Sequence, residues 1–220
     1  MLDRKKFVEE VCMGAIIALV SQKGGVGKSA LARTLARDAA AAGLSVKLAD
    51  LDVQQGTCLD WSRDRNAAGI EPAVSVESFR NAVAALATRD RVDLLILDGP
   101  ARTSQATLEI AKVADVLVQP SGPSADDLRP VVRTWRELVA AGVPIARLAV
   151  ALNCVGSDAE EADARSFLER AGVEALPHAL PERIAFRQAL NTGRAMTETR
   201  YPGLNRMASV VIQDIINKAS

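Results

Sequence analysis

Residues 23–29, with the sequence Lys-Gly-Gly-Val-Gly-Lys-Ser, constrain the fold of this chain more than any other stretch. The apolar run 15–20 before them is typical of a buried strand, and residues 30–42 after them are typical of a helix. A strand, a glycine-rich loop and a helix that starts near Lys-Ser form the setting of a phosphate-binding loop. Glycines let backbone N–H groups turn inward around phosphate oxygens, and the helix adds the positive end of its dipole. The chain is therefore predicted to bind a nucleotide at the end of its first strand.

Two side chains at the end of this loop have predicted tasks of their own. Lys28 is expected to neutralise the β- and γ-phosphates, and the hydroxyl of Ser29 is expected to ligate Mg²⁺. The remaining contacts to the nucleotide are expected from Gly24, Gly25, Val26, Gly27 and Ala30.

Strands and helices alternate along the rest of the chain. This alternation predicts an α/β fold of the phosphate-loop type, a three-layer sandwich with a mostly parallel central sheet. Residues 1–12 are expected to form a flexible extension, and residues 13–220 a single domain. The expected strands are 15–20, 45–49, 73–76, 92–97, 115–119 and 148–153. The expected helices are 30–42, 57–67, 78–88, 103–112, 125–141, 158–171, 182–190 and 204–219.

Composition narrows the class of protein. Positive and negative side chains balance at 27 each, so any affinity for nucleic acid must come from a local basic patch. Cys12, Cys58 and Cys154 lack the spacing of metal ligands, which favours a reduced, cytoplasmic setting. No apolar run approaches the roughly 20 residues of a membrane span, and we expect no membrane association.

Three aspartates fall where the expected strands end. Asp50, Asp52 and Asp98 follow apolar runs, and ligands in open α/β sheets bind at the carboxyl ends of the strands. Asp98 closes the run Leu-Leu-Ile-Leu-Asp and is expected to hold Mg²⁺ directly or through water. An aspartate at a strand end is more often a turn former, but the phosphate loop upstream reverses that preference.

Lys23 distinguishes this loop from an ordinary phosphate loop. It stands too early to hold the same phosphates as Lys28, and it can reach a nucleotide held by a neighbouring subunit. With this lysine, the loop resembles the Lys-Gly-Gly-x-Gly-Lys-Ser/Thr signature of the ParA/MinD family of ATPases, the deviant Walker A motif. The resemblance covers residues 15–220, and its most specific parts are 23–29, 50–54 and 98–100. The chain is most similar to the small partition ATPases, and its length is expected to leave no room for an N-terminal helix-turn-helix.

The resemblance implies an ATPase that needs Mg²⁺ and forms a homodimer around two ATP molecules. Lys23 of each subunit would touch the phosphates of the other, and Asp52 would orient the attacking water and contribute to the metal site. Asp50 would support that site. Two departures stand out: Val53 replaces a proline, which leaves the loop less rigid, and Ala30 replaces a hydroxyl residue, which removes a hydrogen bond worth roughly 1 kcal/mol.

Further along the chain, the resemblance assigns contacts to the base of the nucleotide. Asn153 would read the adenine edge, since an amide both donates and accepts hydrogen bonds, and Pro181 would pack on the ring. A plain turn-forming role for Asn153 remains open.

The last forty residues carry six cationic side chains against three acidic ones. The resemblance implies that ATP-bound dimers bind DNA without sequence preference through late basic residues, and so associate with the nucleoid. A solvated surface of mixed charge is the other interpretation. The candidates are Arg183, Arg187, Arg194 and Arg200.

Several cargoes and two other classes remain open. A ParB-type adaptor on a plasmid or chromosome locus is the first expectation, and a protein cargo such as a carboxysome or chemoreceptor cluster is the second. A MinD-like membrane ATPase would need a basic amphipathic helix, whereas residues 204–219 carry only two cations and are expected to pack on the core. A ligase similar to dethiobiotin synthetase would need a second substrate pocket, for which no residue set is evident.

Overall fold

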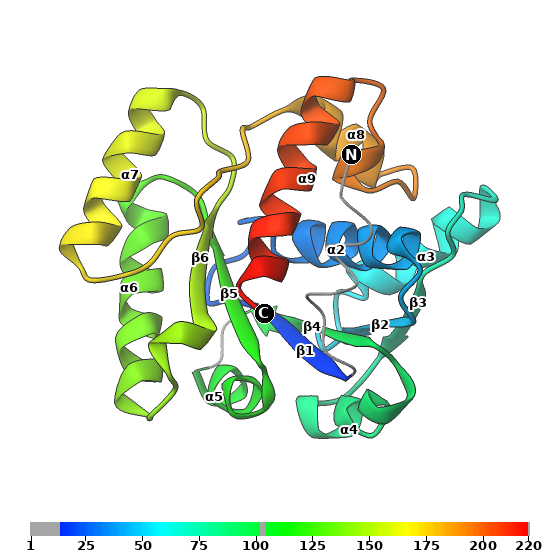
Figure 1. Cartoon of the computed structure of the whole chain (residues 1–220), viewed down its shortest axis with the longest axis horizontal. Helices are drawn as coiled ribbons and strands as arrows, with labels where there is room; N and C mark the ends of the chain where they lie inside the picture. The colour runs from blue at the N-terminus through cyan, green and yellow to red at the C-terminus, as the bar shows by residue number, and fades with distance from the viewer. Residues whose placement is uncertain (1–13, 102–103, 220) are drawn as a thin grey trace.

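The computed structural model describes residues 14–101 and 104–219. Six parallel strands form one sheet in the order β3-β2-β4-β1-β5-β6, with helices on both faces (Figure 1). The three-layer α/β fold predicted from the sequence is confirmed. The strands are β1 (Ala15–Ser21), β2 (Val46–Asp50), β3 (Ser75–Ser78), β4 (Leu94–Ala101), β5 (Val116–Ser121) and β6 (Leu148–Leu152).

Local signals in the sequence set the ends of several helices. The Ser124 hydroxyl accepts from the backbone N–H of Asp127 at the start of α6, and Gly43 ends α2 in a left-handed conformation with φ 98°. The helices are α2 (Lys28–Ala42), α3 (Thr57–Ala67), α4 (Ala82–Leu86), α5 (Ser104–Val113), α6 (Ala125–Ala140), α7 (Asp158–Arg170), α8 (Ile184–Leu190) and α9 (Pro202–Asn217). Short 3₁₀ turns are η1 (Arg89–Arg91), η2 (Ile145–Arg147) and η3 (Met196–Glu198).

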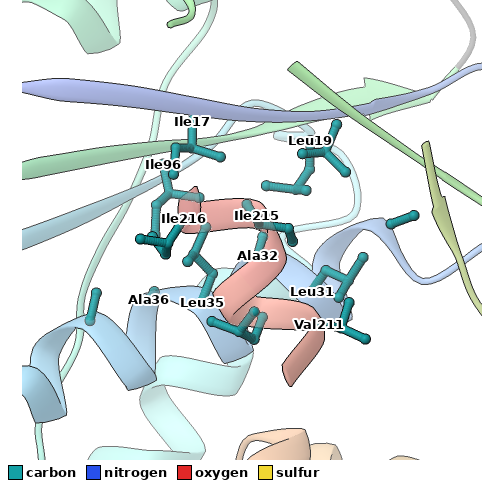
Figure 2. Packing of buried hydrophobic residues seen from close by; sticks show 14 of the residues in the cluster. Ile17, Leu19, Leu31, Ala32, Leu35, Ala36, Ile96, Val211, Ile215 and Ile216 are labelled. Atoms are coloured by element: carbon teal, nitrogen blue, oxygen red, sulfur yellow. The ribbon is translucent and has the colours of Figure 1, made fainter. Parts of the chain in front are cut away.

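The central strands are buried on both faces, and successive side chains serve different helical layers. Ile17 of β1 belongs to the core under α2, α3, α8 and α9, whereas Ile16 belongs to the core under α4, α5, α6 and α7. Figure 2 shows Val211 and Ile215 of α9 packed against Leu31 of α2 below the sheet. The apolar stripe of α9 is thus part of the core, as expected from the sequence.

The structure corrects several of the expected boundaries. The strand expected to end before Asp98 continues to Ala101, so Asp98 lies inside β4 and not at its end. The strand expected at 115–119 also includes Pro120. Proline is tolerated there because β5 pairs with β1 only up to Val118, so no ladder bond to β1 is needed from residue 120. The helix expected at 78–88 shrinks to α4, because Asn81 caps that helix with its side chain. The proposed extension 1–12 lies outside the described residues.

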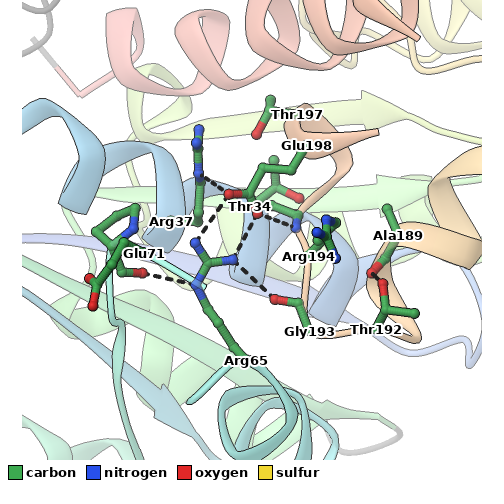
Figure 3. Close-up of polar contacts among 12 residues, drawn as sticks. Thr34, Arg37, Arg65, Glu71, Ala189, Thr192, Gly193, Arg194, Thr197 and Glu198 are labelled. Atoms are coloured by element: carbon green, nitrogen blue, oxygen red, sulfur yellow. Dashed lines mark hydrogen bonds and ion pairs between the residues drawn. The ribbon is translucent and has the colours of Figure 1, made fainter. Parts of the chain in front are cut away.

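A buried arginine fastens the C-terminal segment to the rest of the fold (Figure 3). Arg65 of α3 is fully buried, and its guanidinium donates to both carboxylate oxygens of Glu198 at 2.7 and 3.1 Å. It also donates to the carbonyls of Pro72 and Gly193 at 2.9 and 3.0 Å. Arg37 of α2 adds a bond to Glu198 at 2.9 Å. One carboxylate therefore joins α2, α3 and η3.

We predict that Glu198→Gln lowers the free energy of unfolding by about 3 kcal/mol, because it leaves a buried guanidinium without its counter-charge. Burial alone raises the pKa of Glu198, but hydrogen bonds from Arg65 and from the Ala195 N–H, with the charge of Arg37, outweigh it and lower that pKa. The stabilisation is therefore present above the ordinary carboxyl pKa and is lost as the pH falls through the lowered value. Urea unfolding at neutral and acid pH measures both effects.

The matched control is Glu174→Gln, which removes an exposed partner of Lys218 and should change stability by less than about 1 kcal/mol. Equal losses in the two variants, or a Glu198→Gln deficit that persists unchanged in acid, would contradict the assignment.

Candidate functional site: a nucleotide pocket at the carboxyl edge of the sheet

A pocket of about 540 Å³, here called the phosphate pocket, opens at the carboxyl ends of β1 and β2. The loop 22–27 forms one wall and the segment 52–57 forms the other. Gly25 and Gly27 have φ of 81° and 89°, which only glycine adopts without strain. Gly27 precedes α2 without a side-chain cap, so the first turn of α2 presents its N–H groups to this pocket, an arrangement that favours an anion.

The polar side chains below the loop form a continuous chain of contacts. The Lys28 amine lies 3.1 Å from Oδ1 of Asp98, and the Cys58 thiol donates to Oδ2 of Asp98 at 3.1 Å. The backbone N–H of Cys58 donates to Oδ2 of Asp50 at 3.0 Å. Burial, with the charges of Asp98 and Asp50, raises the pKa of the Cys58 thiol well above its ordinary value, so this thiol stays protonated and remains a donor.

Sheet register explains why these groups meet. Asp98 on β4 pairs with Leu19 on β1 at one side and with Asp50 on β2 at the other. Side chains at paired positions of neighbouring strands point to the same face, here the face covered by α2, from which Lys28 approaches. Burial and the charge of Asp98 raise the pKa of Asp50, while hydrogen bonds from the N–H groups of Cys58 and Asp52 lower it, with a net rise.

The two aspartates of the segment 50–54 are used differently. Asp50 is buried, and its carboxylate accepts from the backbone N–H groups of Asp52 (3.1 Å) and Cys58 (3.0 Å), so it shapes the loop. Asp52 lines the phosphate pocket, where its carboxylate accepts from the Gln55 N–H at 3.3 Å. Both aspartates line this pocket, but Asp50 is buried, so Asp52 has the more accessible side chain of the two.

Lys23 lies at the rim of the phosphate pocket. Its amine forms an ion pair with Asp127 in the first turn of α6, and its side chain is 43% exposed. Asp127 also accepts from the Ser124 hydroxyl at 2.6 Å. Burial raises the pKa of Asp127, but the bonds from Lys23 and Ser124 outweigh it and lower that pKa.

A smaller pocket of about 210 Å³, here called the base pocket, adjoins the phosphate pocket through Gly25, Gly27 and Ala30. Its lining is mostly apolar and includes Pro181. The amide nitrogen of Asn153 donates to the Val26 carbonyl at 2.9 Å, while its buried Oδ1 has no hydrogen-bond partner among the described residues. An unpaired acceptor in an apolar slot fits the amino group of a purine.

Sequence reasoning missed three residues of the site: Arg33, Cys58 and Asp127. Arg33 lines the phosphate pocket, and its Nε donates to the Ser29 carbonyl at 2.9 Å, one helical turn back. That spacing of four residues along α2 was a usable signal. Cys58 and Asp127 meet their partners only through strand register and the position of α6.

The four candidate DNA-binding arginines are all exposed, and they lie on two sides of α8. Arg183 and Arg187 border the base pocket, and Arg187 pairs with Glu182 at 3.4 Å. Arg194 and Arg200 border a separate hollow of about 400 Å³. The structure therefore brings them together in two pairs.

The side chains around the phosphate pocket limit how a metal ion could be bound. No group of three His, Cys, Asp or Glu side chains in the described residues could hold a metal ion by itself. This fits Mg²⁺, which commonly takes one or two protein oxygens and completes its shell with phosphate and water. Ser29, Asp52 and Asp98 lie at or below the phosphate pocket and are suitable oxygen donors. None of the described helices is long and apolar enough to cross a membrane.

Comparison with known proteins identifies the family. The model of the CbiA family, described as the CobQ/CobB/MinD/ParA nucleotide binding domain, matches residues 17–196, and this chain belongs to that family. The chain is also 31% identical over 125 residues to the maintenance of carboxysome distribution protein A of Gloeobacter kilaueensis. That match spans 56% of each of the two proteins, little more than half of the relative's length.

Solved structures share the fold over nearly the whole chain. The ATP complex of McdA from Cyanothece superposes with a TM-score of 0.71 at 18% identity, covering 92% of this chain and 96% of McdA. MinD of Pyrococcus horikoshii, solved with Mg-ADP, gives a TM-score of 0.69 at 16% identity, with coverages of 93% and 94%. The ParA/MinD resemblance inferred from the loop is thereby confirmed, and the members of this family are P-loop ATPases.

Gly27→Ala is predicted to lower both nucleotide affinity and thermal stability. An added Cβ would stand 2.7 Å from the Asn153 amide nitrogen, at a φ that alanine rarely adopts. Binding of a fluorescent ATP analogue and the melting temperature of the ligand-free protein report the two effects. Gly203→Ala in α9, where a Cβ meets nothing within 4 Å, is the matched control and should leave both unchanged. Normal affinity in Gly27→Ala would show that the close packing of loop and amide is dispensable.

Proposed function

We propose that this protein is an ATP-dependent positioning ATPase of the ParA type, which binds Mg-ATP as a homodimer and holds or moves a cargo. The observation that carries this proposal is the convergence of Lys28, Asp98 and a left-handed glycine loop at one edge of the sheet, with Lys23 at the rim. Family membership and the ATP-bound and Mg-ADP-bound neighbours support it.

Each residue of the site has a chemical task in this proposal. The loop N–H groups and Lys28 bind the phosphates, and Ser29, Asp52 and Asp98 hold Mg²⁺, which supplies positive charge against the developing negative charge of phosphoryl transfer. Asp52, whose side chain lines the phosphate pocket, orients the attacking water. Asn153 accepts from the adenine amino group, and Pro181 packs on the ring.

Lys23 acts across the subunit boundary in this scheme. In the single chain its amine is paired with Asp127 and its side chain is 43% exposed, so it is accessible to a second subunit. An ATP-bound partner offers phosphate oxygens of higher charge density than one carboxylate. Exchange of Asp127 for the partner's triphosphate would couple nucleotide binding to dimerisation.

The dimer is proposed to bind DNA without sequence preference and to associate with the nucleoid. Arg183, Arg187, Arg194 and Arg200 are the candidate contacts, since all four are exposed late in the chain. A cargo-bound adaptor of ParB type would stimulate hydrolysis and release the dimer.

Two cargo classes are compatible with the site. The first is a plasmid or chromosome locus. The second is a protein body, and the similarity to a carboxysome distribution protein supports this second class. A MinD-like use of α9 as a membrane anchor is less well supported, because Val211, Ile215 and Ile216 are buried in the core and only Met207 of that stripe is exposed.

Lys23→Ala is expected to lower ATP hydrolysis by roughly 10³–10⁵-fold, the range for charges supplied in trans, while ATP binding persists through Lys28. Steady-state phosphate release and light scattering with ATP measure turnover and dimer formation. Lys112→Ala, the same substitution at an exposed site on α5, should behave like the parent protein. A monomeric ATP complex with unchanged basal turnover in Lys23→Ala would remove this lysine, and the sandwich dimer, from the proposal.

DNA binding is expected to require a non-hydrolysable ATP analogue and to weaken steeply with salt. Because the arginines form two pairs, Arg183→Gln/Arg187→Gln and Arg194→Gln/Arg200→Gln are compared with Arg147→Gln, an exposed arginine elsewhere. Each lost phosphate contact should reduce the slope of log affinity against log salt by about 0.9. If DNA affinity depends neither on the nucleotide nor on either pair of arginines, the DNA-binding surface lies elsewhere or does not exist.

A further inference from the structure

A second hollow of about 630 Å³ lies between α6 and α7, in the helical layer formed by α4, α5, α6 and α7. Figure 1 shows these two helices side by side at the left of the molecule. None of its lining residues borders the phosphate or base pocket. We refer to it as the arginine groove. Its rim is formed by Arg129, Arg133, Arg136 and Arg170, and its floor by Val132 and Phe167.

The rim follows from helix periodicity. Arg129, Arg133 and Arg136 are spaced i, i+4 and i+7, which places them on one face of α6. The opposite face carries buried residues such as Trp135 and Leu138. Arg170, at the end of α7, completes the rim from the neighbouring helix. Half-buried Phe167 leaves an aromatic surface inside the ring of charge.

The charge of this groove is not balanced within the chain. Four guanidiniums face it, against the single carboxylate of Glu137. Arg129 makes an exposed pair with Asp126 at 3.6 Å, whereas Arg133, Arg136 and Arg170 make no ion pair or hydrogen bond with any described residue. In a protein of zero formal net charge, such local concentration of one sign favours an anionic ligand.

Arg165, also on α7, shows the contrast. Its guanidinium is held by Glu161 at 2.8 Å and by the carbonyls of Leu176 and Pro177 at 2.9 and 2.8 Å. The guanidinium of Arg165 is therefore engaged in intramolecular hydrogen bonds. The three unpaired arginines of the groove, by comparison, keep all their donors available.

We propose that the arginine groove binds an acidic segment of a partner protein. Carboxylates of that segment would pair with Arg133, Arg136 and Arg170, since guanidinium forks match carboxylates. An apolar side chain of the segment would pack on Phe167 and Val132. This mode of recognition, a short helix or strand laid into a groove between two helices, combines an apolar floor with a charged rim.

Nucleic acid fits the groove less well. The stripe from Arg129 to Arg136 is only about 11 Å long at 1.5 Å per residue, and phosphates make no use of an apolar floor. A duplex running past it would also meet the acidic side of α7, where carboxylates are exposed. These exposed acidic residues are Asp158, Glu160, Asp163 and Glu169.

The test uses a fluorescein-labelled 15-residue peptide of glutamates that has leucine at every third or fourth position. A second peptide has glutamine in place of every glutamate. Anisotropy titrations of the full chain at low and moderate salt give the affinities, and a 24-base-pair duplex is titrated in parallel. The glutamate peptide should bind, binding should fall with salt, and the glutamine peptide should bind at least about tenfold more weakly.

Arg133→Glu/Arg136→Glu should lower the affinity for the glutamate peptide about tenfold or more. Phe167→Ala should lower this affinity without changing its salt dependence. Arg91→Glu/Arg147→Glu, with the same charge change at exposed sites outside the groove, is the matched control and should bind like the parent. ATP-analogue binding and the melting temperature verify that each variant is folded, and Arg133→Gln/Arg136→Gln replaces the charge reversal if that variant unfolds.

No binding of the glutamate peptide to the parent chain, or equal binding to the groove and control variants, overturns the proposal. Loss of duplex binding in the groove variant, with the peptide unaffected, overturns it in favour of a nucleic-acid surface. Because nucleotide binding is measured separately, failure here leaves the proposed ATPase function untouched.

Discussion

The pairing of Lys28 with Asp98 organises this protein. The two groups are 3.1 Å apart, Asp98 is almost fully buried, and each charge would be costly there without the other. The pair joins the start of α2 to the middle of β4, and so fixes the glycine loop above the sheet edge. A nucleotide with its metal would meet both charges already in place, because the loop and the carboxylate are part of the same rigid core.

The loop that carries Asp52 depends on the same buried cluster. Asp50 accepts from the backbone N–H groups of Asp52 and Cys58, and the Cys58 thiol donates to Asp98. The segment between these anchors lines the phosphate pocket and leaves Val53 exposed. One wall of the phosphate pocket is therefore anchored by hydrogen bonds to two buried carboxylates, those of Asp50 and Asp98.

The two helical layers divide the remaining tasks. The layer of α2, α3, α8 and α9 packs on the face of the sheet where Lys28 meets Asp98. The buried contact of Arg65 with Glu198 stabilises this layer. The layer of α4 to α7 contributes Asp127, the ion-pair partner of Lys23, and presents the arginine groove on its outer side. The proposed nucleotide site and the groove proposed for an acidic partner thus lie on separate surfaces of the molecule.

The sequence by itself determined the fold class, the phosphate loop and the family, because these depend on local patterns: glycines at 24, 25 and 27, apolar strands of period two, and helices of period 3.6. It misplaced Asp98 at a strand end and the helix at 78–88, since neither strand pairing nor the capping role of Asn81 could be judged from composition. The contacts of Cys58 with Asp98 and of Lys23 with Asp127 span 40 and 104 residues. Only the tertiary structure decided them, because strand register and the placement of α6 bring such groups together, and these are set by packing of the whole chain.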